Sequence, residues 1–171
     1  MSAQSKILPA ALTRLIDQFG TLPGVGQRTA ERYAYAVLRH SPQRAQQLAQ
    51  ALDQLHHQVK TCPVTFALID QQSDLSPLYT DPSRDKQLVC VVEEPLDIVA
   101  IERTGHYSGT YHVLGGAISP IDGVGPEQLH IPELISRLQK DHVKELIIAT
   151  NASVEGESTA LFLQRYIQEA G

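Results

Sequence analysis

The residue pattern best suited to binding chemistry lies in residues 21–33. Gly24 and Gly26 stand one residue apart, just ahead of a helical pattern. Glycine lets the backbone approach another surface closely, and the first turn of a helix has N–H groups without intrahelical partners, which suits a phosphate. Arg28 and Arg32 fall on one face of that helix. The segment predicts salt-sensitive contacts to a nucleic acid backbone that do not depend on base sequence. The alternative is an ordinary turn between two helices.

A second group of candidate residues consists of carboxylates that follow two apolar runs. Glu93 comes directly after one run, and Glu155 and Glu157 open a helical pattern after the other. The carboxyl ends of parallel strands face the functional crevice of a sheet, where clustered carboxylates could hold Mg²⁺ for phosphoryl chemistry. Acids in the first turn of a helix also stabilise its dipole. Spacing alone slightly favours this second interpretation.

Composition limits the class of protein. The 171 residues suit one domain or two small ones, and there is neither an apolar run of membrane-spanning length nor a signal-peptide core. Two cysteines make no disulfide framework, so we expect a cytoplasmic protein without a membrane partner. The net charge of −5 divides unevenly, at +4 for residues 1–60 and −9 for residues 61–171. This asymmetry suggests that an anionic polymer meets the first part.

Two kinds of periodicity position these residues. Residues 1–60 predict helices over 8–19, from about 27 to 40, and from 42 to about 59, with a hairpin at 21–26. Residues 61–87 contain three prolines and predict an irregular linker. The remainder alternates strands and helices, which predicts a mainly parallel sheet. We expect strands at 88–92, 111–114 and 146–150, and helices at 95–103, 126–140 and 155–170. Cys90, in mid-strand, is expected in the core.

The carboxylates lead to a resemblance. Glu93 after a buried strand, followed by Ala149-Thr-Asn-Ala-Ser-Val-Glu-Gly-Glu157, resembles a Toprim domain. In Toprim topoisomerases and primases the second segment carries an Asp-x-Asp pair, and here those positions are Asn151 and Ser153. The resemblance therefore implies a domain that retains one glutamate but lacks the metal-binding pair. A Mg²⁺-dependent Toprim nuclease or a primase-like phosphotransferase remains the alternative function.

A longer set of motifs resembles the RecR family of bacterial recombination mediators over residues 8–171. The motifs are Leu22-Pro-Gly-Val-Gly, Asp81-Pro-Ser-Arg-Asp85, Cys90-Val-Val-Glu-Glu-Pro95, Ala100-Ile-Glu-Arg-Thr-Gly105, Tyr111-His-Val-Leu-Gly-Gly116, Ser119-Pro-Ile-Asp-Gly-Val-Gly-Pro126 and Ala149-Thr-Asn. The resemblance implies an α+β protein with a helix-hairpin-helix unit for DNA binding and oligomerisation (1–60), a degenerate zinc-finger-like module (61–87) and a Toprim-like domain (88–171).

Two departures from the family stand out. The family's zinc module carries four cysteines, whereas the matching positions here are Cys62, Thr65, Ser76 and Tyr79. One thiolate cannot satisfy a structural zinc, so we expect no metal and no other cofactor. The family also continues with another strand and a short tail past the position of Gly171. We therefore expect a sheet without one edge strand, or a truncated form.

The resemblance implies a non-catalytic role in recombinational DNA repair. The family works with RecO, and in many bacteria with RecF, to load RecA onto SSB-coated single-stranded DNA, and it forms dimers and ring-like tetramers. On this basis Gly24, Gly26, Arg28 and Arg32 are expected to contact single- or double-stranded DNA. A separate group of acids, Glu93, Glu155 and Glu157, is expected to face a basic partner such as RecO. A purely structural interaction module is a further alternative.

Overall fold

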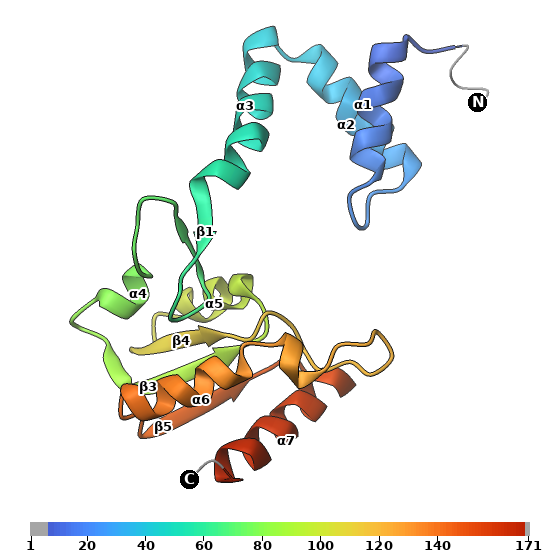
Figure 1. Cartoon of the computed structure of the whole chain (residues 1–171). Helices are drawn as coiled ribbons and strands as arrows, with labels where there is room; N and C mark the ends of the chain where they lie inside the picture. Colours follow the sequence, from blue (N-terminus) through green and yellow to red (C-terminus); the bar gives the residue numbers. More distant parts are fainter. Residues whose placement is uncertain (1–6, 170–171) are drawn as a thin grey trace. The chain divides into compact units, whose positions relative to one another are not determined.

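The computed structural model describes residues 7–169 and divides into two compact units at the boundary between His56 and His57 (Figure 1). The first unit contains helices α1 (Ala10–Gly20) and α2 (Gln27–Arg39) and most of α3 (Pro42–Gln58). The second begins at the end of α3 and contains all the strands. Mixed α and β structure with an N-terminal helical part confirms the predicted fold class, while the three-part division of the chain stays a prediction.

Helices α1 and α2 pack through a small core. Ile16 of α1 and Ala30 and Ala34 of α2 are buried, with apolar side chains of α1 packed around them. The two alanines stand four residues apart, so they form one stripe on α2 where the absence of bulk lets α1 approach. Helix α3 buries none of its residues, and its leucines at 48, 52 and 55 are exposed. It ends at Gln58, one residue earlier than expected, because the β-branched Val59 begins strand β1 (Val59–Thr61) and pairs there with Asp70 of the next strand.

The second unit is built on a parallel three-stranded sheet. Strands β3 (Asp85–Val92), β4 (Gly109–Val113) and β5 (Glu145–Ala149) occur in the order β4-β3-β5, so β3 is central. All three strands run parallel, as the alternation of strands and helices predicted. The other elements are the hairpin of β1 (Val59–Thr61) and β2 (Leu68–Asp70), with α4 (Pro77–Thr80), α5 (Pro95–Glu102), the 3-10 turn η2 (Pro126–Gln128), α6 (Ile131–Lys140) and α7 (Val154–Glu169).

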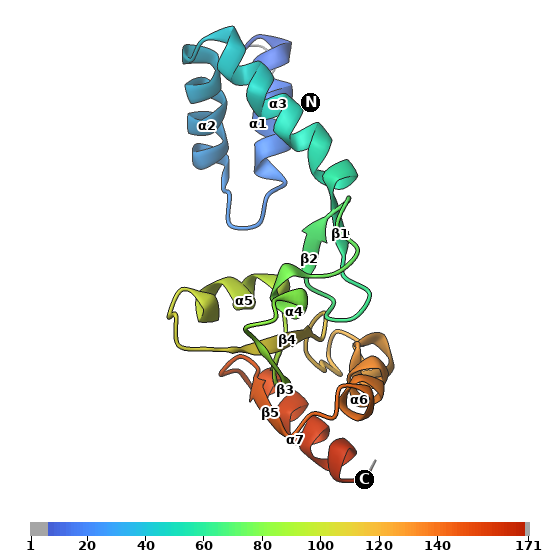
Figure 2. The same ribbon diagram turned by 90° about the vertical axis from the view of Figure 1, so that its left-hand side faces the viewer.

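Strand β3 divides the interior of this unit into two cores. Val89 and Val91 point to one face, where they pack with residues of α6 and α7, while Cys90 and Val92 point to the other face. Figure 2 shows α5 on one side of the sheet and α6 and α7 on the other. Side chains alternate across a strand, so a continuous apolar run requires cover on both faces. Cys90 is 2% exposed, which confirms its expected place in the core.

Two predicted segments differ from the structure. The helix expected over residues 126–140 is interrupted, because Leu129 adopts an extended conformation and buries its side chain, and α6 starts only at Ile131. Pro132 then occupies the first turn of α6, where its missing N–H does no harm. The linker expected to be irregular contains β2 and α4, and its Ala67 joins one of the two cores. The proline content of residues 61–87 indicated that regular structure is interrupted there, but it did not indicate that the segment packs against the core.

His112 is an ionisable group in the interior of β4. It is fully buried, and one of its ring nitrogens, Nε2, lies 2.8 Å from the backbone carbonyl of His130, to which the neutral ring donates. Phe66 packs edge-on against this imidazole and stacks on the ring of His130. Burial lowers the pKa of His112 to about 4. The folded protein therefore holds this histidine neutral, whereas the unfolded chain protonates it near its ordinary pKa.

We predict a loss of stability in mild acid. A pKa that is lower in the folded state gives stability that is complete above the unfolded pKa of 6.5 and is lost as pH falls towards 4. The free energy of unfolding should fall by up to about 3 kcal/mol over this range. Urea titrations at several pH values measure it. His112→Asn should flatten this part of the profile, whereas the exposed-site control His106→Asn should retain it; equal slopes in both variants would contradict the prediction.

Candidate functional site

The turn between α1 and α2 depends on one glycine for its shape. Gly24 has a φ of +75°, a left-handed conformation that favours glycine. Gly26 precedes α2 with an ordinary extended conformation, and its carbonyl accepts the N–H groups of Thr29 and Ala30 at 3.0 Å. Apart from its two neighbours in the chain, a Cβ at Gly26 would meet no atom of residues 7–169 within 4 Å. No contact within residues 7–169 requires glycine at position 26. The absence of a side chain there leaves the backbone open to close approach by another molecule.

The predicted DNA-binding arginines lie on the exposed side of α2. Arg28 and Arg32 are both exposed, and within residues 7–169 neither guanidinium pairs with a carboxylate. The guanidinium of Arg32 lies 5.6 Å from the centre of the Tyr33 ring, which in turn packs edge-on against Phe19 of α1. The turn and both arginines thus share one short segment. This geometry suits two phosphate contacts beside the first turn of α2.

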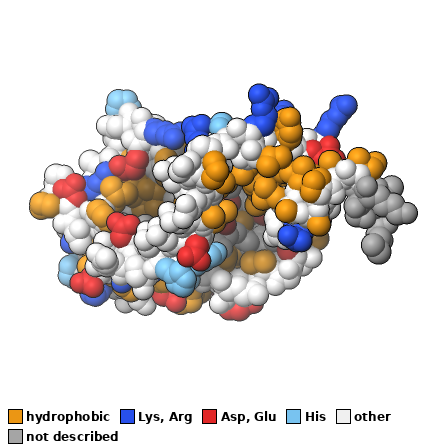
Figure 3. All heavy atoms as spheres, turned by 90° about the horizontal axis from the view of Figure 1, so that it is seen from above, with side chains coloured by type: hydrophobic (Ala, Val, Ile, Leu, Met, Phe, Trp, Pro, Cys, Tyr) orange, Lys and Arg blue, Asp and Glu red, His pale blue; other side chains and the backbone are white. Residues whose placement is uncertain are grey.

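The same unit also has exposed apolar surface. A groove of about 400 Å³ is lined by residues of α1, the end of α2 and the start of α3, among them Leu12, Leu15, Val37 and Leu38. Leu38 is 63% exposed, and the leucines of α3 are also largely open to solvent. In Figure 3 hydrophobic side chains gather beside basic ones on the part of the surface near the N-terminus. This apolar surface makes the helical unit suitable for a protein contact as well as for DNA.

The three predicted partner-binding acids differ in exposure. Glu93 is only 6% exposed, and its carboxylate accepts the backbone N–H of Asn151 at 2.9 Å and also the Asn151 side-chain amide. Glu155 is half-buried and Glu157 is exposed, both in the first turn of α7. The structure thus gives Glu93 an internal role in joining the ends of β3 and β5. A role in partner binding stays a prediction that Glu155 and Glu157 are better placed to fulfil.

The positions of the missing metal ligands have a structural use. Asn151 supplies two hydrogen bonds to Glu93, where an aspartate would supply a second negative charge. Ser153 accepts the backbone N–H of Gly156 at 3.1 Å, at the start of α7. A Cβ at Gly156 would lie 2.1 Å from the carbonyl oxygen of Asn151, so only glycine fits. The carboxyl ends of β3 and β5 are therefore joined by an amide–carboxylate contact, and within residues 7–169 no three His, Cys, Asp or Glu side chains are grouped to hold a metal ion.

Three of the four zinc-module positions are buried together, and the fourth contacts a residue far along the chain. Cys62, Thr65 and Ser76 are buried together, whereas the hydroxyl of Tyr79 donates to the carboxylate of Asp141. Burial raises the pKa of Cys62, but hydrogen bonds from Thr65 and its neighbours outweigh this effect and leave the pKa below its ordinary value. Burial, followed by the nearby Asp141 carboxylate, raises the pKa of Tyr79 and keeps it a donor. Sequence periodicity gave no sign of the contact between Tyr79 and Asp141.

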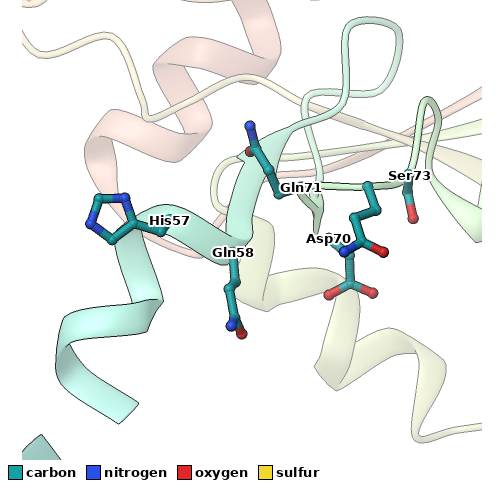
Figure 4. Close-up of a pocket in the computed structure, with 6 residues that line it drawn as sticks. His57, Gln58, Asp70, Gln71 and Ser73 are labelled. Carbon is teal, nitrogen blue, oxygen red and sulfur yellow. The ribbon is translucent and has the colours of Figure 1, made fainter. Parts of the chain in front are cut away.

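Two other features of the second unit have no ligand-binding geometry. Arg84 of the Asp81-Pro-Ser-Arg-Asp85 motif forms an ion pair with Glu102 of α5, so this motif is structural. A hollow of about 480 Å³ beside β2 is lined by His57, Gln58, Asp70, Gln71, Gln72 and Ser73. The side chains labelled in Figure 4 point in different directions and do not converge on one point. Within residues 7–169, no helix is long and apolar enough to cross a membrane.

Comparison with known proteins agrees with this architecture. Residues 87–171 match the model of the Toprim domain, and residues 12–56 match the model of the RecR helix-hairpin-helix. The chain thus has the parts of a helix-hairpin-helix protein with a Toprim domain. It is 50% identical over 157 residues to recombination protein RecR of Frankia alni, covering 92% of this chain and 78% of that protein. It is also 45% identical over 163 residues to RecR of Desulfatibacillum aliphaticivorans, covering 95% and 81%.

A third relative, RecR of Chloroflexus aggregans, is 47% identical over 165 residues, which cover 96% of this chain and 80% of that protein. The chain therefore belongs to the RecR family of recombination proteins. The two matched segments leave residues 57–86 between them, which contain the degenerate zinc positions. The resemblance inferred from the motifs is confirmed, and the departure at those four positions concerns a segment outside both matches.

We predict that Asn151→Asp destabilises the second unit. The change removes the side-chain donor to Glu93 and places two carboxylates in contact, which should lower the free energy of unfolding by about 1–3 kcal/mol at pH 7. Urea unfolding measures the loss. Ser153→Asp is the matched control, because it adds the same charge two residues away and retains an oxygen for the Gly156 N–H. Equal stability of Asn151→Asp and wild type would show that the contact is unimportant.

Proposed function

We propose that the protein acts in recombinational DNA repair as a non-catalytic, DNA-binding mediator. In this role it forms a clamp-like oligomer in the cytoplasm and works with RecO, and where present RecF, to load RecA onto SSB-coated single-stranded DNA. The observation that carries the proposal is the exposed turn and arginine pair of α2 in a chain of the RecR family. The family supplies the expectation, and the turn geometry supplies a physical means of holding DNA.

The DNA contact follows from charge and backbone geometry. Arg28 and Arg32 offer two cations on one helical face, beside the first turn of α2, and they find phosphates on single and double strands alike. Two phosphate contacts make a weak site that is sensitive to salt. Repetition of the same contact around an oligomer raises the total affinity without any new kind of contact. The proposal therefore includes a homodimer or a ring-like homotetramer.

Exposed apolar surface supports assembly through the helical unit. The groove of α1, α2 and α3 and the exposed leucines of α3 leave apolar area that a single unit does not cover. In the second unit, Glu155 and Glu157 stand near the exposed Val154 at the start of α7. An acidic and apolar surface of this kind suits a partner with a basic surface, and we assign it to RecO.

We predict that the Arg28→Ala/Arg32→Ala variant binds DNA at least tenfold more weakly and that its salt dependence becomes shallower, by up to about two released counterions per subunit. Fluorescence anisotropy across a range of salt concentrations measures both effects, with the mass of each variant determined in solution. Arg103→Ala/Arg165→Ala, in the second unit, changes the net charge equally and should bind as wild type does. An assembled Arg28→Ala/Arg32→Ala variant with unchanged binding would refute the DNA role of the turn.

We also predict that the protein does not cut DNA or extend primers in Mg²⁺ or Mn²⁺. The competing function, a Toprim nuclease or a primase-like phosphotransferase, needs carboxylates at positions 151 and 153, where this chain has an amide and a hydroxyl. Gel assays with single- and double-stranded substrates test this point, and Glu93→Ala serves as the matched control for contaminating activity. Turnover by the wild type that Glu93→Ala abolishes would make the protein an enzyme and overturn the proposal.

A further inference from the structure

The zinc-module positions lack a donor set for zinc. They offer one thiol, two hydroxyls and one phenol, from Cys62, Thr65, Ser76 and Tyr79, whereas structural zinc sites use four nitrogen or sulfur ligands. Within residues 7–169, His, Cys, Asp and Glu side chains nowhere form a group of three or more placed to hold a metal. The group that the family would place here does not fit this chain. The segment nevertheless folds, so other contacts must hold it.

The first set of contacts closes the segment on itself. The sulfur of Cys62 accepts the backbone N–H of Ser76 at 3.3 Å and that of Thr65 at 3.5 Å. These three residues are at most 4% exposed, so the two chain segments converge on a dry thiol. Sulfur is a weak acceptor, and a thiol cannot replace the four bonds of a metal centre. Closure around Cys62 therefore needs support from outside the segment.

That support comes from α6 of the Toprim domain. The hydroxyl of Tyr79 donates to both oxygens of the Asp141 carboxylate, at 3.1 and 3.2 Å. Arg137 donates to the same carboxylate through Nε at 3.1 Å, and its guanidinium lies 5.0 Å from the centre of the Tyr79 ring. The side chains of Arg137 and Asp141 are 4% and 8% exposed. Removal of either partner from a buried ion pair destabilises the fold, because the remaining charge is left buried without compensation.

The network continues into the sheet. Arg137 also donates to the carbonyl of Tyr111 and to the hydroxyl of Thr110, both on β4. At the other end of the segment, the carbonyl of Thr65 accepts the N–H of Val113 at 2.8 Å. The ring of Phe66 stacks on that of His130 with 3.8 Å between centroids. Both halves of the degenerate module are thus attached to the Toprim domain.

We propose that this module is metal-independent, and that the Tyr79–Asp141–Arg137 network, together with closure around Cys62, replaces zinc by fastening residues 62–80 to the Toprim domain. In a zinc module the metal joins the two halves directly to each other. Here the halves meet through the weak hydrogen bond from Ser76 to Cys62, and each half is also joined to β4 or to the end of α6. The order of residues 62–80 therefore depends on the adjoining domain and not on metal supply.

A restoration experiment tests the metal half of the proposal. Wild-type protein should contain far less than one zinc per chain, and its melting temperature should not change with a chelator. Thr65→Cys/Ser76→Cys/Tyr79→Cys should bind one Zn²⁺ or Co²⁺ per chain, with the absorption of a cobalt–thiolate centre. One zinc per wild-type chain, or melting that a chelator lowers, would overturn the proposal. A triple variant that folds without binding either metal would show that the four positions are not equivalent to a zinc site.

A second variant tests the network itself. Tyr79→Phe keeps the ring but removes the hydrogen bonds to Asp141, and it should lower the melting temperature by about 2–8 °C. Chymotrypsin should then cleave within residues 62–80 several-fold faster than in wild type, as shown by fragment masses. Tyr166→Phe, on α7 of the same unit, is the matched control and should change neither quantity. The network has no fastening role if the two variants behave alike.

Discussion

The second unit depends on the need of β3 to be paired on both edges and covered on both faces. Its backbone forms parallel ladders with β4 and β5, while Val89 and Val91 enter one core and Cys90 and Val92 enter the other. The strand is buried from Val89 to Val92, so the elements around this half are fixed by what they must cover. The carboxyl ends of β3 and β5 then lie side by side, which brings Glu93 to Asn151.

The features that the sequence predicted well are those with short-range causes. Glycine at the end of α1, the apolar periodicity of the helices and the apolar runs of β3 and β5 each act within a few residues. The parallel sheet followed from the alternation of these elements. The turn between α1 and α2 was also visible, because its glycines and a pair of arginines one helical turn apart are properties of the local chain, while its contact with DNA stays a prediction.

The contacts that the sequence did not reveal join residues far apart in the chain. Tyr79 and Asp141 are 62 positions apart, and nothing about either residue type predicts its partner. An arginine in an amphipathic helix such as α6 is usually exposed. Arg137 is nevertheless buried, because it donates to one backbone carbonyl and one side-chain hydroxyl on β4. Glu93 is a similar case. Its location directly after a strand suggested a functional crevice, but in the structure its carboxylate is paired with Asn151, 58 positions away. Long-range pairing is decided by packing, which no local pattern contains.

The contact between Glu93 and Asn151 has a consequence for how this chain can change by mutation. Gly156 leaves no room for a side chain beside it, and the buried carboxylate of Glu93 accepts the backbone N–H and the side-chain amide of Asn151. A chain evolving towards metal-dependent chemistry would have to exchange this amide for an acid before any cation was bound. The intermediate sequence would carry two unneutralised acids at the end of the sheet. A change of positions 151 and 153 to acids, made one substitution at a time, therefore passes through a less stable sequence.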